Sequence, residues 1–406
     1  MQAHRNMRLS AALGILALLS ALVGLASGPP ASMTASSPAS PASFYHPIYE
    51  FNHGYTYHVT LARRDDLFVV AYMDASNSFY GTARVGLLVN NQITYGPEVV
   101  FNAGNTSDIS LAFIGSNTIV IAFCDVSDND EGKMVIGTLS GNSLSFGSVY
   151  NFSTHEAHSI SVDNALTNQF VIAYQKTSTY PSGEVAACAY SGGAISCGSH
   201  QTFNAAETSF VTVNVLADSP AYFVLAYRDN GDSGWGKMMA GSISGGEITL
   251  GSETFFNSIT GHISVADLTA FTLALVYRDE SNSNYGTAQI IGRTNLNLNT
   301  NTEYVFNTGD TMILSSFGVT DISGTRFAVG FYTGAYVGRT VFGDLSSTDI
   351  SFSEGAQFNP GEQSDLPAVS AYRSGFITCW SDKSDSDRGK CRVYGIAWLF
   401  MPRLSK

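Results

Sequence analysis

The chain has 406 residues, with 33 acidic and 20 basic side chains and a formal net charge of -13. Hydrophobic residues make up 44% of the sequence, which excludes a disordered chain, and the acidic balance argues against binding to nucleic acid or to anionic lipid. The 39 glycines and 25 phenylalanines, with only 13% charged residues, favour an all-β chain rich in turns.

Residues 1–26 have the pattern of a secretory signal peptide. His4, Arg5 and Arg8 precede an apolar run, Ala11 to Ala26, that ends in small residues suited to signal peptidase. The competing interpretation is an uncleaved membrane anchor, but the run is at the short end for a bilayer span. Residues 27–43 are a Ser/Pro/Ala linker. We therefore expect a secreted protein without membrane insertion after cleavage, folded as a single domain over residues 44–406.

Three sequence markers then recur together, with a period of 49 to 54 residues. The first is an aromatic residue that ends an apolar run: Tyr72, Phe123, Tyr174, Tyr227, Tyr277, Phe331 and Trp380. The second is a glycine seven or nine residues later: Gly81, Gly132, Gly183, Gly236, Gly286, Gly338 and Gly389. The third is a phenylalanine, usually followed by asparagine: Phe51, Phe101, Phe152, Phe203, Phe256, Phe306 and Phe358. The chain therefore contains seven copies of one unit.

Each copy contains four strand-like segments and no helical pattern. In the second copy these segments cover residues 109–114, 118–123, 133–139 and 143–152. Four strands in each of seven repeats predict an all-β fold, a seven-bladed β-propeller with four-stranded blades. The seventh copy ends after three strands, the third over residues 390–398, and residues 45–51 match the missing fourth strand. We expect this N-terminal strand to complete the last blade and close the ring, which removes the open edge between the first and last blades.

Five cysteines fit an oxidising compartment. Cys188 and Cys197 flank a Gly-Gly turn, and Cys379 and Cys391 bracket one hairpin loop, so each pair is a candidate disulfide. Cys124 is left over as a buried thiol, because a catalytic role would need a histidine partner that the sequence does not identify. Asn105 and Asn151 begin N-glycosylation sequons, which suit a secreted glycoprotein.

The loop between the second and third strands carries the pattern Asp-x-x-[Asn/Asp]-x-x-x-Gly in five copies. Asp and Asn cap tight turns, and this structural interpretation explains a feature that occurs once per blade. A carbohydrate site is the first functional alternative, because an aromatic ring precedes the loop glycine in three copies. Its candidate residues are Asp74, Asn77, Tyr80, Asp229, Asp232, Trp235, Asp279, Asn282 and Tyr285. Calcium is the second alternative, with the candidate ligands Asp125, Asp128, Asp130 and Glu131 in one loop.

Polar residues also fall at the starts of the first strands, which line the central channel of a propeller. These residues are His58, Asp108, His158, His262 and Asp365. Histidines that come from different blades need not converge, and isolated histidines are commonly hydrogen-bonded structure. We therefore expect no metal site at these positions.

The sequence favours a secreted, non-enzymatic binding protein, lectin-like or adhesive, whose repeated hairpin loops bind carbohydrate or an extracellular protein. An enzyme would break the repeat symmetry with added polar groups, whereas the divergent third and sixth copies lose them in the hairpin loop. A polysaccharide lyase or hydrolase is the alternative, and a structural module that displays a surface to another protein is the second alternative. No cofactor is implied apart from calcium.

Overall fold

Strands account for nearly all the regular structure of this chain. The computed structural model describes residues 47–217, 219, 221–312, 325–346, 349–353, 356–360, 362–372 and 375–394. The helices in these ranges are three-residue 3-10 turns, η1 (Ala75–Asn77), η2 (Val126–Asp128), η3 (Asn230–Asp232) and η4 (Lys383–Asp385). The prediction of an all-β fold is confirmed. The predicted signal peptide, the linker and residues 395–398 of the last predicted strand lie outside the described residues.

The strands follow one another in the order expected from the repeats. Those of the first three copies are β1 (Tyr49–Arg64), β2 (Leu67–Asp74), β3 (Tyr80–Val89), β4 (Gln92–Phe113), β5 (Thr118–Asp125), β6 (Glu131–Ser140), β7 (Ser143–Leu166), β8 (Gln169–Thr177), β9 (Ser182–Ser191), β10 (Ala194–Cys197) and β11 (Gln201–Asn204). The next two copies hold β12 (Thr208–Val215), β13 (Tyr222–Asp229), β14 (Trp235–Ser244), β15 (Glu247–Leu250), β16 (Thr254–Asn257), β17 (Thr260–Thr269), β18 (Thr272–Asp279), β19 (Tyr285–Thr294) and β20 (Asn297–Asn307). The last copies hold β21 (Thr311–Met312), β22 (Arg326–Thr333), β23 (Gly338–Ser346), β24 (Asp349–Phe352), β25 (Ala356–Gln357), β26 (Ser364–Tyr372), β27 (Gly375–Asp382) and β28 (Arg388–Tyr394). No helix in the described ranges is long and apolar enough to cross a membrane.

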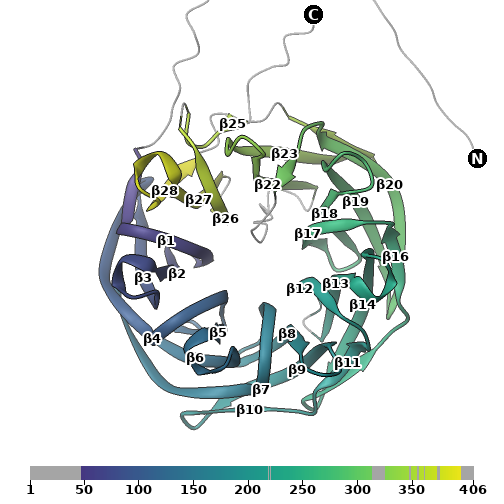
Figure 1. The fold of residues 1–406 in the computed structure, drawn as a ribbon, viewed down its shortest axis with the longest axis horizontal. Helices are drawn as coiled ribbons and strands as arrows, with labels where there is room; N and C mark the ends of the chain where they lie inside the picture. The colour runs from purple at the N-terminus through teal and green to yellow at the C-terminus, as the bar shows by residue number, and fades with distance from the viewer. Residues whose placement is uncertain are drawn as a thin grey trace, which may run out of the picture. The chain divides into compact units, whose positions relative to one another are not determined.

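Long strands connect successive copies. The first half of β4 pairs with β3 and its second half pairs with β5, so one strand is the fourth of one copy and the first of the next. The strand β7 does the same between β6 and β8. The sequence predicts two separate strands here. Both halves are extended and the chain between them stays extended, so the structure joins them. Figure 1 shows the sheets arranged around a common centre, with β1, β12, β17 and β26 on the inner side.

The three sequence markers meet in space between successive copies. A Cβ atom built on Gly236 would lie 2.5 Å from the ring of Phe256, so only glycine leaves room for that ring. The same ring packs on Tyr277 of the next copy, with ring centroids 5.1 Å apart. The glycine and phenylalanine markers make this contact in all seven copies. The markers therefore recur together because each set forms one packing unit.

The N-terminal strand takes part in this pattern. Asn52 of β1 pairs with Gly389 of β28, as Asn102 of β4 pairs with Gly81 of β3. The ring of Phe51 fills the space above Gly389 and packs on Tyr72 of the first copy, with centroids 5.1 Å apart. The strand β1 thus contacts the last copy and the first copy in the way that the other phenylalanine strands contact their neighbours.

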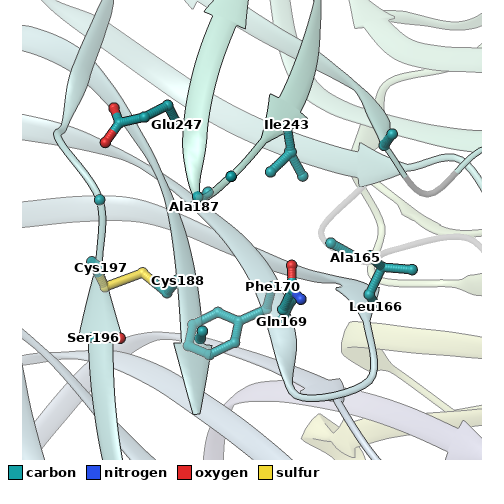
Figure 2. Close-up of a pocket in the computed structure, with 15 residues that line it drawn as sticks. Ala165, Leu166, Gln169, Phe170, Ala187, Cys188, Ser196, Cys197, Ile243 and Glu247 are labelled. Carbon is teal, nitrogen blue, oxygen red and sulfur yellow. A yellow bond between two sulfur atoms is a disulfide. The ribbon is translucent and has the colours of Figure 1, made fainter. Parts of the chain in front are cut away.

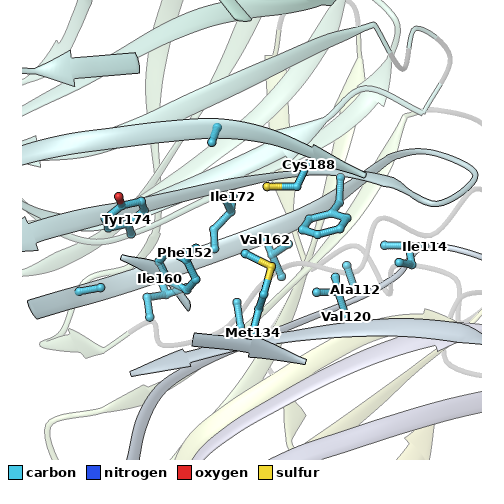
Figure 3. Packing of buried hydrophobic residues seen from close by; sticks show 14 of the residues in the cluster. Ala112, Ile114, Val120, Met134, Phe152, Ile160, Val162, Ile172, Tyr174 and Cys188 are labelled. Atoms are coloured by element: carbon cyan, nitrogen blue, oxygen red, sulfur yellow. The ribbon is translucent and has the colours of Figure 1, made fainter. Parts of the chain in front are cut away.

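Hydrophobic cores lie between neighbouring copies. The cluster in Figure 3 combines Val120 and Met134 of the second copy with Phe152, Ile172 and Tyr174 around the third. All five side chains are at least nine-tenths buried. Because each core is shared by two copies, a copy is stable only beside its neighbours.

Candidate functional site

The aspartates of the hairpin loops hold turns together. Asp74, Asp229 and Asp279 are buried, with 4–7% of their surface exposed. Asp74 caps η1 by accepting a hydrogen bond from the backbone N–H of Ser76, and Asp229 caps η3 in the same way through Asp232. The capping that the turn interpretation predicts is present, and these carboxylates already have partners. Asn77 and Asn282, the fourth residues of their loops, are exposed.

The four carboxylates of the calcium candidate do not share one centre. The Lys133 ammonium binds Asp125 at 2.9 Å and also binds Asp128. Asp130 accepts a hydrogen bond from the Cys124 thiol, with 3.6 Å between oxygen and sulfur, whereas Glu131 accepts one from the Asn151 amide at 2.7 Å. The Lys133 ammonium thus occupies the place between Asp125 and Asp128 where the sequence suggests a calcium ion.

The candidate aromatic residues begin the third strands. Tyr80, Trp235 and Tyr285 are the first residues of β3, β14 and β19, and they belong to three different loops. Trp235 is 40% exposed, and its ring packs on Phe255 with centroids 5.1 Å apart. The three aromatic residues therefore do not form one common site.

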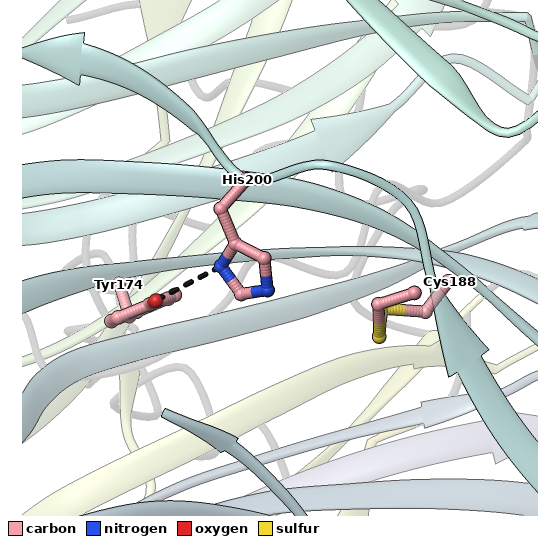
Figure 4. The surroundings of a disulfide bond; sticks show 4 residues. Tyr174, Cys188 and His200 are labelled. Carbon is pink, nitrogen blue, oxygen red and sulfur yellow. Dashed lines mark hydrogen bonds between the residues drawn. A yellow bond between two sulfur atoms is a disulfide. The ribbon is translucent and has the colours of Figure 1, made fainter. Parts of the chain in front are cut away.

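The two predicted disulfides are confirmed. Cys188 pairs with Cys197 across the β9–β10 hairpin, and Cys379 pairs with Cys391 between β27 and β28. Figure 4 shows the first bridge near Tyr174, whose hydroxyl lies 3.0 Å from His200 Nδ1. Two disulfides fit an extracellular protein.

A mainly apolar pocket of about 620 Å³ lies beside this disulfide. Phe170, Ile243 and the Cys188–Cys197 bridge form much of its wall, and Glu247 contributes a carboxylate (Figure 2). Few polar side chains line it, so it provides little to bind a hydroxyl-rich ligand.

The inner strands enclose a second, more polar cavity. Its volume is about 350 Å³, and three consecutive residues from each of β1, β4, β7, β12 and β17 line it, together with one from β26. The central residue of each of these five segments is a valine or an isoleucine. Hydroxyl side chains come from Thr60, Ser110, Ser161, Thr212 and Ser264, at equivalent positions of the five strands.

Each of these inner strands carries a β-bulge at the cavity. The residue within the bulge has a positive φ, between 47° and 51°, in all five strands: His58, Asp108, Ser159, Phe210 and His262. This backbone region is uncommon for residues other than glycine, and for a bulky residue such as Phe210 it is an outlier. Such strain is concentrated at functional sites, where the surrounding structure maintains it.

Asp108 is the only carboxylate among the described residues that line the cavity. It lies 3.3 Å from His158 Nδ1 and accepts a hydrogen bond from the Ser159 N–H at 3.0 Å. Burial alone would raise the pKa of Asp108, but the hydrogen bond with His158 and the field of His58 hold it below its usual value. The bond to Asp108 raises the pKa of His158 to about 10, while burial lowers that of His58. His158 is therefore an imidazolium at neutral pH, paired with the Asp108 carboxylate.

The sequence places His58, Asp108, His158 and His262 at the starts of the first strands, but it does not bring them together. In the structure His58, Asp108 and His262 line one cavity, and His158 binds Asp108 from the adjacent strand. It also places Cys124 Sγ within 4.8 Å of ligand atoms of Asp108 and His158. The sequence analysis missed this histidine partner, although the cysteine occurs once among the repeat copies at its position. The side chain of Asp365 is outside the described part of the chain.

No protein-family model matches the chain, and no curated protein matches it. Several solved structures are similar. The polysaccharide lyase Uly1 is 8% identical, with a TM-score of 0.53, and the match covers 84% of this chain and 90% of that one. The periplasmic gluconolactonase PpgL of Pseudomonas aeruginosa is 12% identical, with a TM-score of 0.51 and coverage of 78% and 92%. A triple mutant of AofleA from Arthrobotrys oligospora is 8% identical, with a TM-score of 0.50 and coverage of 77% and 89%.

The fold is β-propeller-like. At these identities the likeness concerns the fold alone, and it is compatible with a binding role or an enzymatic role without deciding between them. The choice between binding and catalysis depends on the residues of the site itself.

Proposed function

We propose that the chain is a secreted β-propeller protein that binds carbohydrate in its central cavity. The single domain of residues 44–406 would comprise seven four-stranded blades, and β1 would complete the last blade. The pairing of β1 with β28 and the contact of Phe51 with Gly389 support this closure. The two disulfides fit secretion behind a cleaved signal peptide of residues 1–26.

The convergence of five bulge residues on one cavity carries the proposal. A sugar ring needs hydrogen-bond donors and acceptors for its hydroxyls and an aromatic surface for its C–H face. Asp108, His58 and the hydroxyl side chains supply the polar groups, and Phe210 supplies a ring that packs on His262 with centroids 4.8 Å apart. A volume of about 350 Å³ suits one or two sugar units.

The hairpin loops are the alternative place for this binding. Asn77, Asp232, Asn282 and the aromatic residues Tyr80, Trp235 and Tyr285 would form separate weak sites whose avidity depends on a repetitive ligand. The buried capping aspartates would then support the loop rather than touch the sugar.

The test is a glycan-array screen of residues 44–406, with and without calcium, for the native protein and two variants. Phe210→Asn removes the ring and places a residue that tolerates positive φ, so the fold should persist. The second variant combines Tyr80→Ala, Trp235→Ala and Tyr285→Ala. We expect the native protein and the triple variant to bind one glycan class, and Phe210→Asn to weaken that binding at least about 10-fold.

The reverse pattern, with loss of binding only in the triple variant, would move the site to the hairpin loops. A blank array for the native protein would overturn the carbohydrate proposal. The polysaccharide-enzyme alternative is favoured by the ionisable Asp108–His158 pair at the cavity wall, and it predicts that the bound glycan is cleaved during incubation. The array ligand should therefore be analysed for chain shortening as well as binding.

A further inference from the structure

Cys124 is the one cysteine of the five that is not in a disulfide. It lies on β5, in the hydrophobic cluster between the second and third copies, and its side chain is fully buried. Asp108 approaches it from β4 and His158 approaches it from β7. One thiol, one carboxylate and one imidazole thus meet from three strands of two neighbouring copies.

Comparison of the repeat copies shows that this combination of three side chains is specific to one junction. The positions equivalent to Asp108 carry His58, Ser159, Phe210 and His262, and those equivalent to His158 carry Tyr57, Ser107, Ser209 and Gly261. The positions equivalent to Cys124 carry Met73, Gln175, Arg228, Arg278, Tyr332 and Ser381. Among these described copies, only the junction of the second and third combines three groups that can bind a metal.

The spacing fits a tetrahedral ion. Two ligands bound to zinc at about 2.0–2.1 Å lie roughly 3.3 Å from each other. Asp108 Oδ2 and His158 Nδ1 are 3.3 Å apart, and all three ligand atoms lie within 4.8 Å of one another. The thiol sulfur would need to move by on the order of 1 Å to complete the set.

The donor types select the metal. A thiolate with an imidazole and a carboxylate suits zinc, whereas calcium needs six to eight oxygen ligands. A nucleophilic role for the thiol is not supported, because Cys124 has no exposed surface that a substrate could reach.

We propose that Asp108, Cys124 and His158 bind one zinc ion beside the central cavity, and that the ion displaces the ligand protons of Cys124 and His158 on binding. Three protein ligands leave a fourth position for water or for a ligand atom, as in zinc sites that perform chemistry rather than structure alone. Asp108 also lines the cavity, so an ion held by it would lie next to whatever the cavity binds. The site does not depend on the proposed carbohydrate role.

The disulfides make a spectroscopic test specific. Only Cys124 can provide a thiolate, so a sulfur-to-cobalt charge-transfer band of the Co²⁺-loaded protein would report on this residue. The experiment titrates Co²⁺, then Zn²⁺, into the chelator-treated protein, residues 44–406, and into Cys124→Ser, Asp108→Asn and His158→Gln. The matched control is His200→Gln, an exposed histidine that contacts Tyr174 and is not one of the three grouped ligand residues. Thermal melting without metal verifies that each variant is folded.

We expect one ion per chain, a thiolate band that Zn²⁺ abolishes, loss of the band in Cys124→Ser, and affinity lower by about 10- to 100-fold or more in the other two site variants. His200→Gln and Phe210→Asn should bind metal like the native protein. Absence of uptake, or uptake that all three site variants retain, would overturn the proposal. If one site variant does not fold, the other two decide. Loss of glycan binding in Phe210→Asn with intact metal uptake separates the two proposals.

Discussion

The marker residues of this chain are constrained chiefly by the close packing of a glycine against a phenylalanine ring. Each marker glycine lies under a phenylalanine ring, and no side chain, not even a methyl group, fits between them. The asparagine that follows the phenylalanine has a role of its own. The Asn52 amide donates to Thr56 Oγ1 at 3.0 Å, and Asn102 and Asn204 make the same bond to a threonine four residues later. These local bonds fix the start of the inner strands that build the cavity.

At this scale we predict that Gly236→Ala destabilises the protein. The added methyl group would overlap the Phe256 ring, and overpacking of this kind costs about 1–3 kcal/mol. Gly292→Ala is the matched control, because a Cβ atom there meets nothing within 4 Å. Urea unfolding of both variants measures the difference. Equal unfolding free energies for the two variants would show that the glycine–phenylalanine contact is not tight in solution.

At the scale of the element, the five hairpin loops with the aspartate pattern are of two kinds, which differ in their fourth residue and in the facing residue of the third strand. Where the fourth loop residue is Asp, the third strand carries a lysine that binds it, as Lys133, Lys237 and Lys390 do. Where the fourth residue is Asn, in the first and fifth copies, the lysine position holds Thr82 or Thr287. Charge in the loop is therefore matched by charge on the strand, copy by copy.

This pairing predicts the outcome of exchanging one version for the other in the second copy. Lys133→Thr should destabilise the protein by about 3 kcal/mol, because it leaves the buried Asp125 carboxylate unpaired beside Asp128. Adding Asp128→Asn should restore part of that loss by removing the repulsion between the two carboxylates. Thermal and urea unfolding measure both, and Lys176→Thr, which has no such pair of carboxylates, should change little. A double variant no more stable than the single one would contradict the explanation.

For the whole molecule, the contact between the two ends of the repeat array is decisive. The segment Tyr49 to Tyr55 of β1 pairs with β28 and covers its edge. A chain that begins at Thr56 would expose that edge, and an uncovered strand edge invites pairing with other chains. We predict a lower melting temperature and concentration-dependent oligomers for this truncation. Removal of residues 27–43 alone should change neither property.

Light scattering after size-exclusion chromatography distinguishes the two truncations. A chain without residues 44–55 that remains monomeric and melts like the native protein would refute closure through β1.

The sequence determined the periodic part of this protein. The strands, the marker contacts and both disulfides depend on residues close in the chain or at fixed repeat spacing. Antiparallel register then fixes which residues face each other, as it places Cys188 opposite Cys197. The aspartate caps follow in the same way, because a cap binds a backbone N–H only two or three residues away. Hairpin geometry is local, so sequence patterns report it.

Only the tertiary structure decided what the copies form together. Asp108 and His158 are separated by 50 residues, and the direction of each side chain depends on a bulge whose positive φ has no glycine to reveal it. The Lys133 ammonium likewise occupies the loop for which the sequence suggests calcium. Packing between neighbouring sheets sets the distances among Asp108, Cys124 and His158, and that packing depends on side chains from several strands at once. No single stretch of sequence contains it.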